Sequence, residues 1–454
     1  MVKDMKKYIP YIAIIAITII LLICIPLVDN TKDNQEQTNE LEVMIVGESD
    51  NNLVLLSNDD IIYTIEKAKL TGKLGDNVLI TYTGIIDEST NILDVDIIDY
   101  SITPRTTTNL TNSNDIFGKY YEMASRKLQE LTLDEKIGQL FLIRYDENTA
   151  LNDLSKYKVS GFVFYEKDFK DKTESSVKNM INNLQNKSTI PLLTATDEEG
   201  GKIVRVSSNP NLVSEKFKSS RELYQTGGMN AIKEDTINKS KVLKNLGINL
   251  NLAPVVDVST NPSDYMYERT IGENSEITST YAKTVITASK GTGVSYTLKH
   301  FPGYGNNPDT HTTSSIDNRT YESIMTNDIP PFQAGIDAKA EAILISHNIV
   351  SSIDPDNEAS LSPAIHNLLR NDLNFTGVII TDDISMGAIS NLQDASVKAV
   401  LAGNNLIITS DSDTSIGAIK TAINNNTISE ELIDSLALRV LAFKYYKGLM
   451  IDEK

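Results

Sequence analysis

From residue 119 to the C-terminus, short apolar runs alternate with longer stretches of helical pattern. Each run is four or five residues long and precedes a polar loop, as a buried parallel strand does. The eight runs are Leu140–Ile143, Gly161–Phe164, Leu192–Ala195, Leu250–Ala253, Val294–Leu298, Ala342–Ile345, Val378–Thr381 and Leu406–Thr409. The helical stretches are Ser176–Asn186, Ile232–Leu246, Ile277–Gly291, Ile329–Lys339 and Glu431–Tyr446.

Eight strand–helix units in about 330 residues predict an α/β fold, a (β/α)8 barrel of the TIM type that spans residues 119–454. A doubly wound open sheet is the competing architecture. In that fold a glycine-rich phosphate-binding loop commonly follows the first strand, and none follows Leu140–Ile143. The sequence therefore favours the barrel.

Residues 41–100 have a different pattern. Five short β-like runs, punctuated by Asn, Asp and Gly, predict a small all-β domain, either a barrel or a sandwich. The runs are Val43–Val46, Leu53–Leu56, Ile61–Ile65, Val78–Tyr82 and Val95–Ile98. No residue of this domain suggests chemistry, so we expect a spacer or a docking module. A polar tether, residues 29–40, precedes it, and a Thr- and Asn-rich linker, residues 101–118, follows it.

The first 28 residues have the pattern of a membrane anchor. Tyr8–Val28 carries no charge and is dominated by Ile and Leu, and about 20 such residues span a bilayer. Lys3, Lys6 and Lys7 precede this run, and lysines mark the cytoplasmic side. We expect a single-pass protein of the cell membrane whose remaining chain lies outside the cytoplasm. A buried helix of a soluble protein is the alternative, and a cleaved signal peptide is disfavoured because no small-residue cleavage site follows.

Composition excludes several classes of protein. The 61 Asp and Glu outnumber the 42 Lys and Arg, which gives a net charge of -19. A chain of this charge repels phosphate backbones, so nucleic acid is not an expected partner. The single cysteine, Cys24, permits no intrachain disulfide and no cysteine-based metal cluster.

Charged and imidazole side chains follow five of the predicted strands, at the end of the barrel where active sites lie. They are Asp197 after the third strand, Asp257 after the fourth, Lys299, His300, Asp309 and His311 after the fifth, Ser346–Asn348 after the sixth, and Asp382 and Asp383 after the seventh. Three of the four histidines of the chain belong to this set. The sequence therefore predicts an active site at this end.

Asp382 and Asp383 end a β-branched strand, and alternate side chains of a strand point to opposite faces. We therefore expect only one of them to enter the barrel mouth. A carboxylate held there is suited to act as a nucleophile toward an anomeric carbon, as a general base or as a metal ligand. The alternative is that both residues cap the helix that follows.

Asp309 and His311 lie two residues apart in a loop rich in Gly, Asn, Pro and Thr. An aspartate beside an imidazole orients it and raises its basicity, as a general acid/base near neutral pH requires. A chance pair in a loop is the alternative. We predict no metal and no other cofactor, because no His-x-x-x-His or similar ligand spacing is present. Arg205, Arg269 and Lys299 are suited to bind sugar hydroxyls, although surface ion pairing is the commoner use of such residues.

Residues 119 to about 446 resemble the family 3 glycoside hydrolases, in particular the bacterial β-N-acetylglucosaminidase (β-hexosaminidase) type. Six segments match in the family's order: LDEKIGQL at Leu133–Leu140, DEEGGKIVR at Asp197–Arg205, NLAPVVDV at Asn251–Val258, RTIG at Arg269–Gly272, KHFPGYG at Lys299–Gly305 with DTH at Asp309–His311, and TDDISM at Thr381–Met386.

The resemblance implies a role for each matching residue. Asp382 would be the nucleophile, and His311, oriented by Asp309, would be the acid/base. The sugar-binding residues would be Asp197, Arg205, Arg269, Lys299 and His300. The chain departs from the family's usual residues at Glu198 (usually Gln), Lys202 (Arg), Thr270 and Ile271 (Ser and Phe) and Tyr304 (His), and the loop to Asp309 is one residue shorter than in the commonest form.

We therefore expect an exo-acting, retaining β-N-acetylglucosaminidase that hydrolyses terminal β-linked GlcNAc through a glycosyl-enzyme intermediate. The outward-facing anchor favours cell-wall (peptidoglycan-type) glycans as substrate. The alternatives are a β-glucosidase or a GlcNAc phosphorylase of the same family, a mechanism in which the substrate's own acetamide is the nucleophile, and a non-catalytic, membrane-anchored glycan-binding protein. The expected partners are a carbohydrate and, through the N-terminal helix, the membrane.

Overall fold

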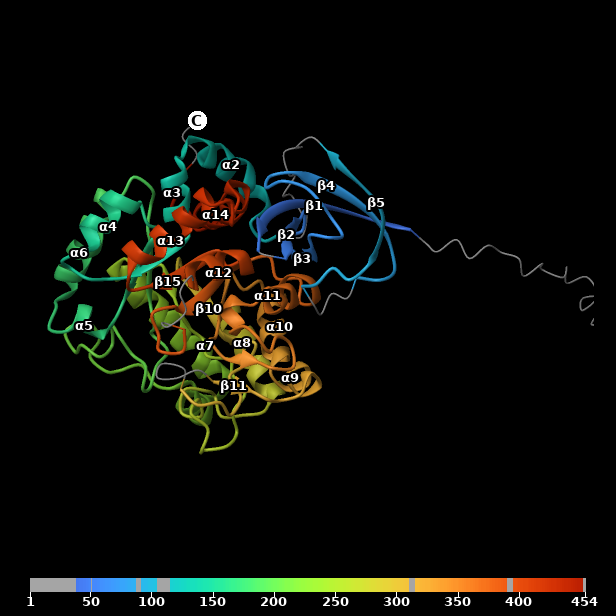
Figure 1. Cartoon of the computed structure of the whole chain (residues 1–454). Helices are drawn as coiled ribbons and strands as arrows, with labels where there is room; N and C mark the ends of the chain where they lie inside the picture. Colours follow the sequence, from blue (N-terminus) through green and yellow to red (C-terminus); the bar gives the residue numbers. More distant parts are fainter. Residues whose placement is uncertain are drawn as a thin grey trace, which may run out of the picture.

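A computed structural model describes residues 38–49, 51–86, 91–103, 115–309, 315–389 and 395–451 (Figure 1). The predicted membrane segment Tyr8–Val28, most of the tether 29–40, most of the linker 101–118 and the predicted acid/base His311 lie outside these residues. Within the described part of the chain, no helix has the combination of length and apolar character that a membrane crossing needs.

Residues 39–103 form a five-stranded antiparallel sheet, here called the N-terminal sheet, in the order β3-β2-β1-β4-β5. Its strands are β1 (Asn39–Glu48), β2 (Asn52–Ser57), β3 (Ile62–Glu66), β4 (Asn77–Thr83) and β5 (Asp96–Thr103). Each of the five predicted runs overlaps one of these strands. The strand ladders leave β3 and β5 as the two edges, but Thr64 of β3 also pairs with Ile92, just before β5, so the two edges approach each other as in a small barrel. Ile45, Leu55 and Ile80 are fully buried in its core.

Eight parallel strands close into a barrel in the order β6-β7-β8-β9-β10-β12-β14-β15. They are β6 (Phe141–Arg144), β7 (Gly161–Phe164), β8 (Leu193–Thr196), β9 (Leu250–Asn251), β10 (Ser295–Phe301), β12 (Ala342–Ile345), β14 (Val378–Asp383) and β15 (Leu406–Thr409). The predicted TIM-type fold and all eight of its strands are confirmed. The doubly wound alternative is wrong, because β15 pairs with β6 and closes the sheet.

Helices surround the barrel (Figure 1). They are α2 (Tyr121–Glu130), α3 (Leu133–Gly138), α4 (Ala150–Tyr157), α5 (Glu166–Phe169), α6 (Glu174–Lys187), α7 (Ser220–Leu246), α8 (Ser275–Ser289), α9 (Tyr321–Asn327), α10 (Ile329–Asp337), α11 (Pro363–Asn367), α12 (Ala395–Ala402), α13 (Ser412–Asn424) and α14 (Glu430–Tyr446). Short elements complete the fold: η2 (Gly118–Tyr120), η3 (Ala359–Leu361), a π-helical turn η4 (Leu368–Asp372), and the strand pair β11 (Ile316–Asp317) and β13 (Ile349–Val350).

Local sequence explains where several helices begin. Thr132 and Glu135 form a capping box at the start of α3, because each side chain accepts the other's backbone N–H. Asn274 and Ser429 cap α8 and α14 in the same way with one side-chain bond each. The five predicted helical stretches overlap α6, α7, α8, α10 and α14.

The N-terminal sheet packs directly on the barrel. Asn367, at the end of α11, exchanges two hydrogen bonds with the backbone of Ile62, at 3.1 and 2.6 Å. Arg439 of α14 forms an ion pair with Asp60 in the β2–β3 turn. Ile62 and Val46 belong to the same apolar cluster as the barrel helices. One face of the sheet therefore packs into the core of the barrel, while Ile45, Leu55 and Ile80 belong to a separate cluster within the N-terminal sheet.

Candidate active site

The carboxyl ends of the barrel strands surround a cavity of about 180 Å³. Six of the predicted site residues line it: Asp197, Arg205, Arg269, Lys299, His300 and Asp382. The other lining residues are Arg144, Tyr165, Glu199, Ile203, Tyr265, Asp383 and Met386. Strands β8, β10 and β14 deliver these groups because parallel strands end at the same edge of a barrel. The structure therefore brings these six predicted residues together around one cavity.

Asp382 and Asp383 both line the cavity at the end of β14. Strict alternation would turn one of them away, but the pairing of β14 with β15 shifts register between Ile380 and Asp383. The expectation that only one carboxylate enters the mouth is therefore wrong. Asp383 is buried, accepts the backbone N–H of Ser385 at 2.9 Å, and lies 3.6 Å from Arg144 Nη1. Asp382 is the more exposed of the two.

The carboxylate of Asp383 is held from several sides. Burial raises its pKa, the Ser385 N–H and Arg144 lower it, and the neighbouring Asp382 raises it further, so the net direction is upward. His347, fully buried at the end of β12, lies 3.0 Å through Nε2 from the backbone carbonyl of Asp383. Because a carbonyl only accepts, His347 Nε2 carries the proton. This imidazole fixes the backbone beside Asp382 without lining the cavity.

Two carboxylates and three cations form a network in the cavity wall. Lys299 Nζ lies 2.8 Å from Asp197 Oδ1 and 2.8 Å from Glu199 Oε1. Arg269 donates twice to Glu199, from Nη2 at 2.7 Å and from Nε at 3.1 Å. Arg205 Nη2 lies 3.7 Å from the other oxygen of Asp197. The side chains of Lys299 and Glu199 are only 4% and 5% exposed, so water screens these contacts little.

The network keeps its members charged. Burial lowers the pKa of Lys299, but Asp197 and Glu199 more than offset this effect and the pKa rises. Burial raises the pKa of Glu199, but Arg269 and Lys299 outweigh it and the pKa falls. Lys299 and Glu199 are therefore both ionised at neutral pH. A sugar entering the cavity meets donors and acceptors that are already fixed in place.

His300 is held in one tautomer. Its Nδ1 lies 2.8 Å from Asp257 Oδ2, and its Nε2 lies 3.4 Å from Arg269 Nη2. A guanidinium only donates, so Nε2 accepts and Nδ1 carries the proton toward Asp257. Asp257, 1% exposed, also accepts the backbone N–H of Tyr304 at 2.7 Å. Asp257 therefore orients His300 from behind the cavity.

Glu198, one of the departures from the family's usual residues, supports the loop that carries Arg205. Its side chain is fully buried and accepts the backbone N–H groups of Arg205 at 2.9 Å and Val206 at 2.6 Å. The Ser207 hydroxyl donates to its other oxygen. Burial raises the pKa of Glu198, while these hydrogen bonds lower it less. The departure changes the support of the cavity and leaves its lining unchanged.

Asp309 lies at the rim of the cavity, beside Tyr265. Tyr265 lies close enough to Asp309 and Arg269 for both to shift the pKa of its hydroxyl, and its side chain is 40% exposed. Burial raises the pKa of Tyr265, Arg269 lowers it and Asp309 raises it. Tyr265 also packs on Tyr304, with ring centroids 5.8 Å apart. His311 lies outside the described residues, so its predicted place next to Asp309 stays a prediction.

Sequence reasoning missed Glu199, Tyr265, Arg144 and Tyr165 as lining residues. Arg144 ends β6 and Tyr165 directly follows β7, so the rule that chemistry lies at strand ends was a usable signal for both. Glu199 lies two residues after Asp197, which places the two on one side of an extended segment. Tyr265 lies in the loop after β9, and nothing in that loop distinguishes it from Tyr267.

Comparisons with known proteins identify the family of this chain. Residues 132–443 match the family model described as "Glycosyl hydrolase family 3 N terminal domain". The β-hexosaminidase of Xanthomonas campestris pv. campestris (strain B100) is 28% identical over 234 residues, which are 51% of this chain and 70% of that protein. The β-hexosaminidase of Xylella fastidiosa (strain M23) is also 28% identical, over 235 residues, 51% of this chain and 69% of that protein.

Solved structures of similar fold include a family 3 β-N-acetylglucosaminidase from Paenibacillus sp., with 27% identity and a TM-score of 0.67. That match covers 71% of this chain and 64% of the Paenibacillus chain. The β-N-acetylhexosaminidase of Beutenbergia cavernae has 26% identity and a TM-score of 0.63, over 70% of this chain and 99% of its own. The segment matched by the family model contains every residue that lines the cavity and excludes the N-terminal sheet. The chain belongs to family 3 of the glycoside hydrolases.

Proposed function

We propose that this protein is an exo-acting, retaining β-N-acetylglucosaminidase that releases terminal β-linked GlcNAc. The observation that carries the proposal is the shared cavity of Asp382 with Asp197, Arg205, Arg269, Lys299 and His300. A space of about 180 Å³ walled by fixed charges suits one terminal sugar ring. The similarity to β-hexosaminidases and β-N-acetylglucosaminidases of other bacteria supports GlcNAc as that sugar.

In the proposed first step, a carboxylate oxygen of Asp382 attacks the anomeric carbon while the bond from that carbon to the leaving-group oxygen breaks. His311, oriented by Asp309, gives its proton to the leaving oxygen. In the second step His311 takes a proton from water, the water oxygen attacks the anomeric carbon, and Asp382 is released. An imidazole is suited to both transfers because its ordinary pKa lies near neutrality.

The remaining lining residues would bind the sugar and stabilise the transition state. Lys299 and Arg269 donate to hydroxyl groups, and Asp197 accepts from them. Their mutual ion pairs through Glu199 hold these groups in position before the sugar arrives. The net negative charge of Asp382 then faces the carbon on which positive charge develops.

A substrate panel tests the proposal. We expect nitrophenyl β-GlcNAc to be hydrolysed with a kcat/KM at least 100-fold above that of nitrophenyl β-glucoside. The acetamide is the only difference between the two sugars, so this ratio measures its recognition. A preference for the glucoside would replace the proposed activity with that of a β-glucosidase.

Whether water or phosphate accepts the glycosyl group in the second step is tested separately with inorganic phosphate. An imidazole acid/base repels phosphate less than a carboxylate would, so phosphorolysis is a specific alternative. We expect free GlcNAc as the product with and without phosphate. A sugar 1-phosphate formed only when phosphate is added would identify a phosphorylase.

We further propose that Tyr8–Val28 anchors the protein in the cell membrane with the barrel outside the cytoplasm, where cell-wall glycans lie. The uncharged run and the preceding lysines support this arrangement. We expect the full chain to remain with membranes after alkaline extraction, and added protease to cut it in intact spheroplasts. Recovery of the full-length chain in the soluble fraction would contradict the anchor.

A further inference from the structure

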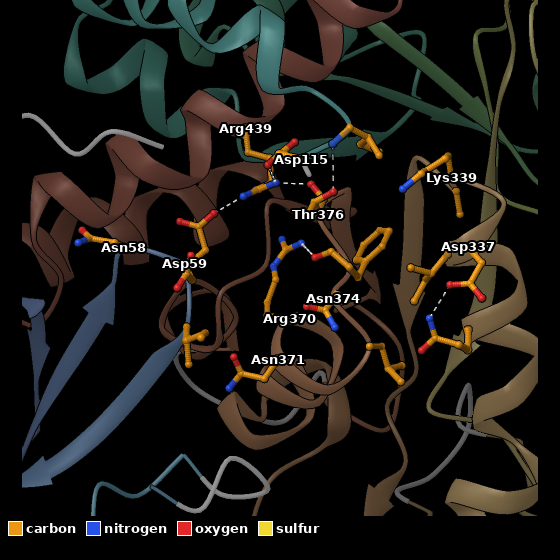
Figure 2. Close-up of a pocket in the computed structure, with 18 residues that line it drawn as sticks. Asn58, Asp59, Asp115, Asp337, Lys339, Arg370, Asn371, Asn374, Thr376 and Arg439 are labelled. Carbon is orange, nitrogen blue, oxygen red and sulfur yellow. Dashed lines mark hydrogen bonds and ion pairs between the residues drawn. The ribbon is translucent and has the colours of Figure 1, made fainter. Parts of the chain in front are cut away.

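A second and larger cavity, here called the basal cavity, lies between the N-terminal sheet and the barrel (Figure 2). Its volume is about 570 Å³, roughly three times that of the catalytic cavity, about 180 Å³. It is lined by the β2–β3 turn at Asn58–Ile61, by Ala340 just before β12, and by Phe375 and Thr376 just before β14. Because these strands begin there, the basal cavity lies at the end of the barrel opposite the active site.

Polar side chains without partners face this cavity. Asp59, Lys339 and Asn374 form no side-chain hydrogen bond or ion pair with the described residues, and the buried amide nitrogen of Asn371 has no acceptor there. Figure 2 shows Asp59 on one side, Lys339 on the other, and Asn371 and Asn374 between them. Asp59, Lys339 and Asn374 are exposed, so their polar groups meet solvent in the cavity and can exchange it for a ligand, whereas the Asn371 nitrogen is shielded from solvent in the cavity wall.

The two arginines of the cavity are already satisfied within the protein. Arg370 donates to the backbone carbonyls of Phe375 at 2.7 Å and Gly377 at 2.8 Å, and to the side chain of Asn405 at 3.0 Å. Arg439 forms ion pairs with Asp60 and Asp115. Neither guanidinium is left as a counter-ion for an anionic ligand.

The unpartnered groups indicate the class of ligand. Asp59 and Lys339 carry opposite charges, and the exposed amide of Asn374 offers both a donor and an acceptor. Such a set favours neither an anion nor a cation. It suits neutral hydroxyl groups, each of which donates and accepts, while the apolar side chains of Ile61, Ile116 and Ile336 line the same space for the faces of sugar rings.

We propose that the basal cavity is a second, non-catalytic saccharide site that binds a short neutral oligosaccharide. If the catalytic cavity takes one ring, the basal cavity has room for about three, and its volume lies in the range of about 300–1,000 Å³ typical of small-molecule sites. The choice of β-linked GlcNAc as the sugar rests on the proposed function. The site would hold the enzyme on its glycan while chain ends reach the active site.

Binding measured without turnover tests this site. The full chain carrying Asp382→Asn is titrated with the β-linked GlcNAc trimer by calorimetry, and we expect two equivalents bound per chain. When Asp59→Ala and Lys339→Gly are added to the Asp382→Asn chain, the affinity for the second trimer should fall at least 10-fold. Both side chains are exposed, and Lys339 has a φ of 66°, which glycine adopts freely, so the fold should persist.

A matched control separates the cavity from general effects of the substitutions. Asp96→Ala with Lys158→Gly removes an exposed aspartate of the N-terminal sheet and a lysine whose φ is 54°, both outside the cavity lining. This control should bind two equivalents with unchanged affinity. Binding of one equivalent by the Asp382→Asn chain, or two unchanged equivalents in the Asp59→Ala, Lys339→Gly chain, would overturn the proposal.

Two further experiments distinguish a failure of this inference from a failure of the proposed function. With Asp382 intact, the Asp59→Ala, Lys339→Gly chain should hydrolyse nitrophenyl β-GlcNAc at the wild-type rate. If the wild type does not cleave that substrate, the proposed function fails, and the titration is repeated with a β-linked glucose trimer. Loss of the second equivalent for either trimer supports a saccharide site, whereas displacement of both trimers by inorganic phosphate at the cavity would identify an anion site and overturn it.

Discussion

Buried cations are held differently at the two ends of the barrel, although one at the basal end, Arg439, is paired with Asp60 and Asp115 much as the cations of the catalytic end are paired. At the catalytic end, Lys299 and Arg269 lie 2.8 and 2.7 Å from Glu199, and carboxylates raise the pKa of both cations above its ordinary value despite burial. At the other end, Lys444 and Arg370 are buried, and no carboxylate among the described residues pairs with either. Burial lowers the pKa of Lys444 to about 7 and, with a neighbouring arginine, that of Arg370 to about 9.

The difference reflects what each end does. A cation paired with a carboxylate keeps its charge and its position, which binding and transition-state stabilisation require. Lys444 instead donates to Gln139 Oε1 at 2.6 Å and to the carbonyl of Ser160 at 3.1 Å. It therefore ties the start of two barrel strands together, and it remains useful as a donor even when neutral. A structural tie can therefore be made by hydrogen bonds alone, as at Lys444, or by ion pairs, as at Arg439.

Replacing Asp382, the proposed nucleophile, should have the largest effect. Asp382→Asn removes the attacking carboxylate, so we expect kcat for nitrophenyl β-GlcNAc to fall by at least about 1,000-fold. Asp411→Asn changes the exposed cap of α13 outside the cavity and should leave the rate nearly unchanged. A variant at position 382 that kept a tenth of the activity would exclude this residue as the nucleophile.

Breaking the charge pairing at the catalytic end should come next. Glu199→Gln leaves Arg269 and Lys299 buried with one carboxylate fewer, so we expect kcat/KM to fall roughly 100-fold and the free energy of unfolding to fall by about 3 kcal/mol. Kinetics and urea unfolding measure the two effects. Glu222→Gln breaks an exposed pair with Lys218 and should change neither. Equal behaviour of the two variants would refute the role assigned to Glu199.

The unpaired lysine at the opposite end should appear in the pH dependence of stability. Between its folded pKa of about 7 and its ordinary value near 10.4, the unfolded chain binds more protons at Lys444. The free energy of unfolding should therefore rise with pH, by at most about 2 kcal/mol between pH 7 and 9 from this group. Lys444→Met should remove that rise in urea unfolding, and exposed Lys398→Met should keep it. An unchanged slope in the Lys444 variant would show that this lysine is charged at pH 7.

The smallest effect concerns the rim of the catalytic cavity. Tyr265→Phe keeps the ring and removes the hydroxyl whose pKa Asp309 raises. Loss of one polar contact costs about 1 kcal/mol, so we expect kcat/KM to fall roughly 5-fold, with a shifted pH–rate profile. Tyr267→Phe, in the same loop but outside the cavity lining, serves as the control. Identical profiles for the Tyr265 variant and the wild type would remove Tyr265 from the positioning of the acid/base.

Much of the barrel could be predicted, because a strand buried on both faces is a continuous apolar run. The predicted run Ala342–Ile345, for example, coincides with β12, and Leu406–Thr409 with β15. The N-terminal sheet was harder: its strands are visible as runs, but whether a sheet closes depends on pairing between distant residues. The basal cavity could not be predicted from the sequence, because it is formed between Asn58–Ile61 and residues about 300 positions away.

Six site residues could be predicted because they follow strands and match a family pattern. The adjacent carboxylates Glu198 and Glu199 show where that reasoning ends. One accepts backbone N–H groups beneath a loop, and the other lines the cavity between two cations. Loop geometry decides between these uses, and the two residues have the same chemistry in the sequence. Asp383 likewise enters the cavity through a register shift that the strand pattern does not reveal.

Covalent trapping tests the central claim most directly. A 2-fluoro sugar with a good leaving group slows release of the glycosyl-enzyme, so peptide mass spectrometry can locate the attached sugar. We expect one sugar per chain, with fragmentation that assigns it to Asp382. Turnover without any adduct would favour the substrate's acetamide as nucleophile, and an adduct on another residue would place the chemistry elsewhere.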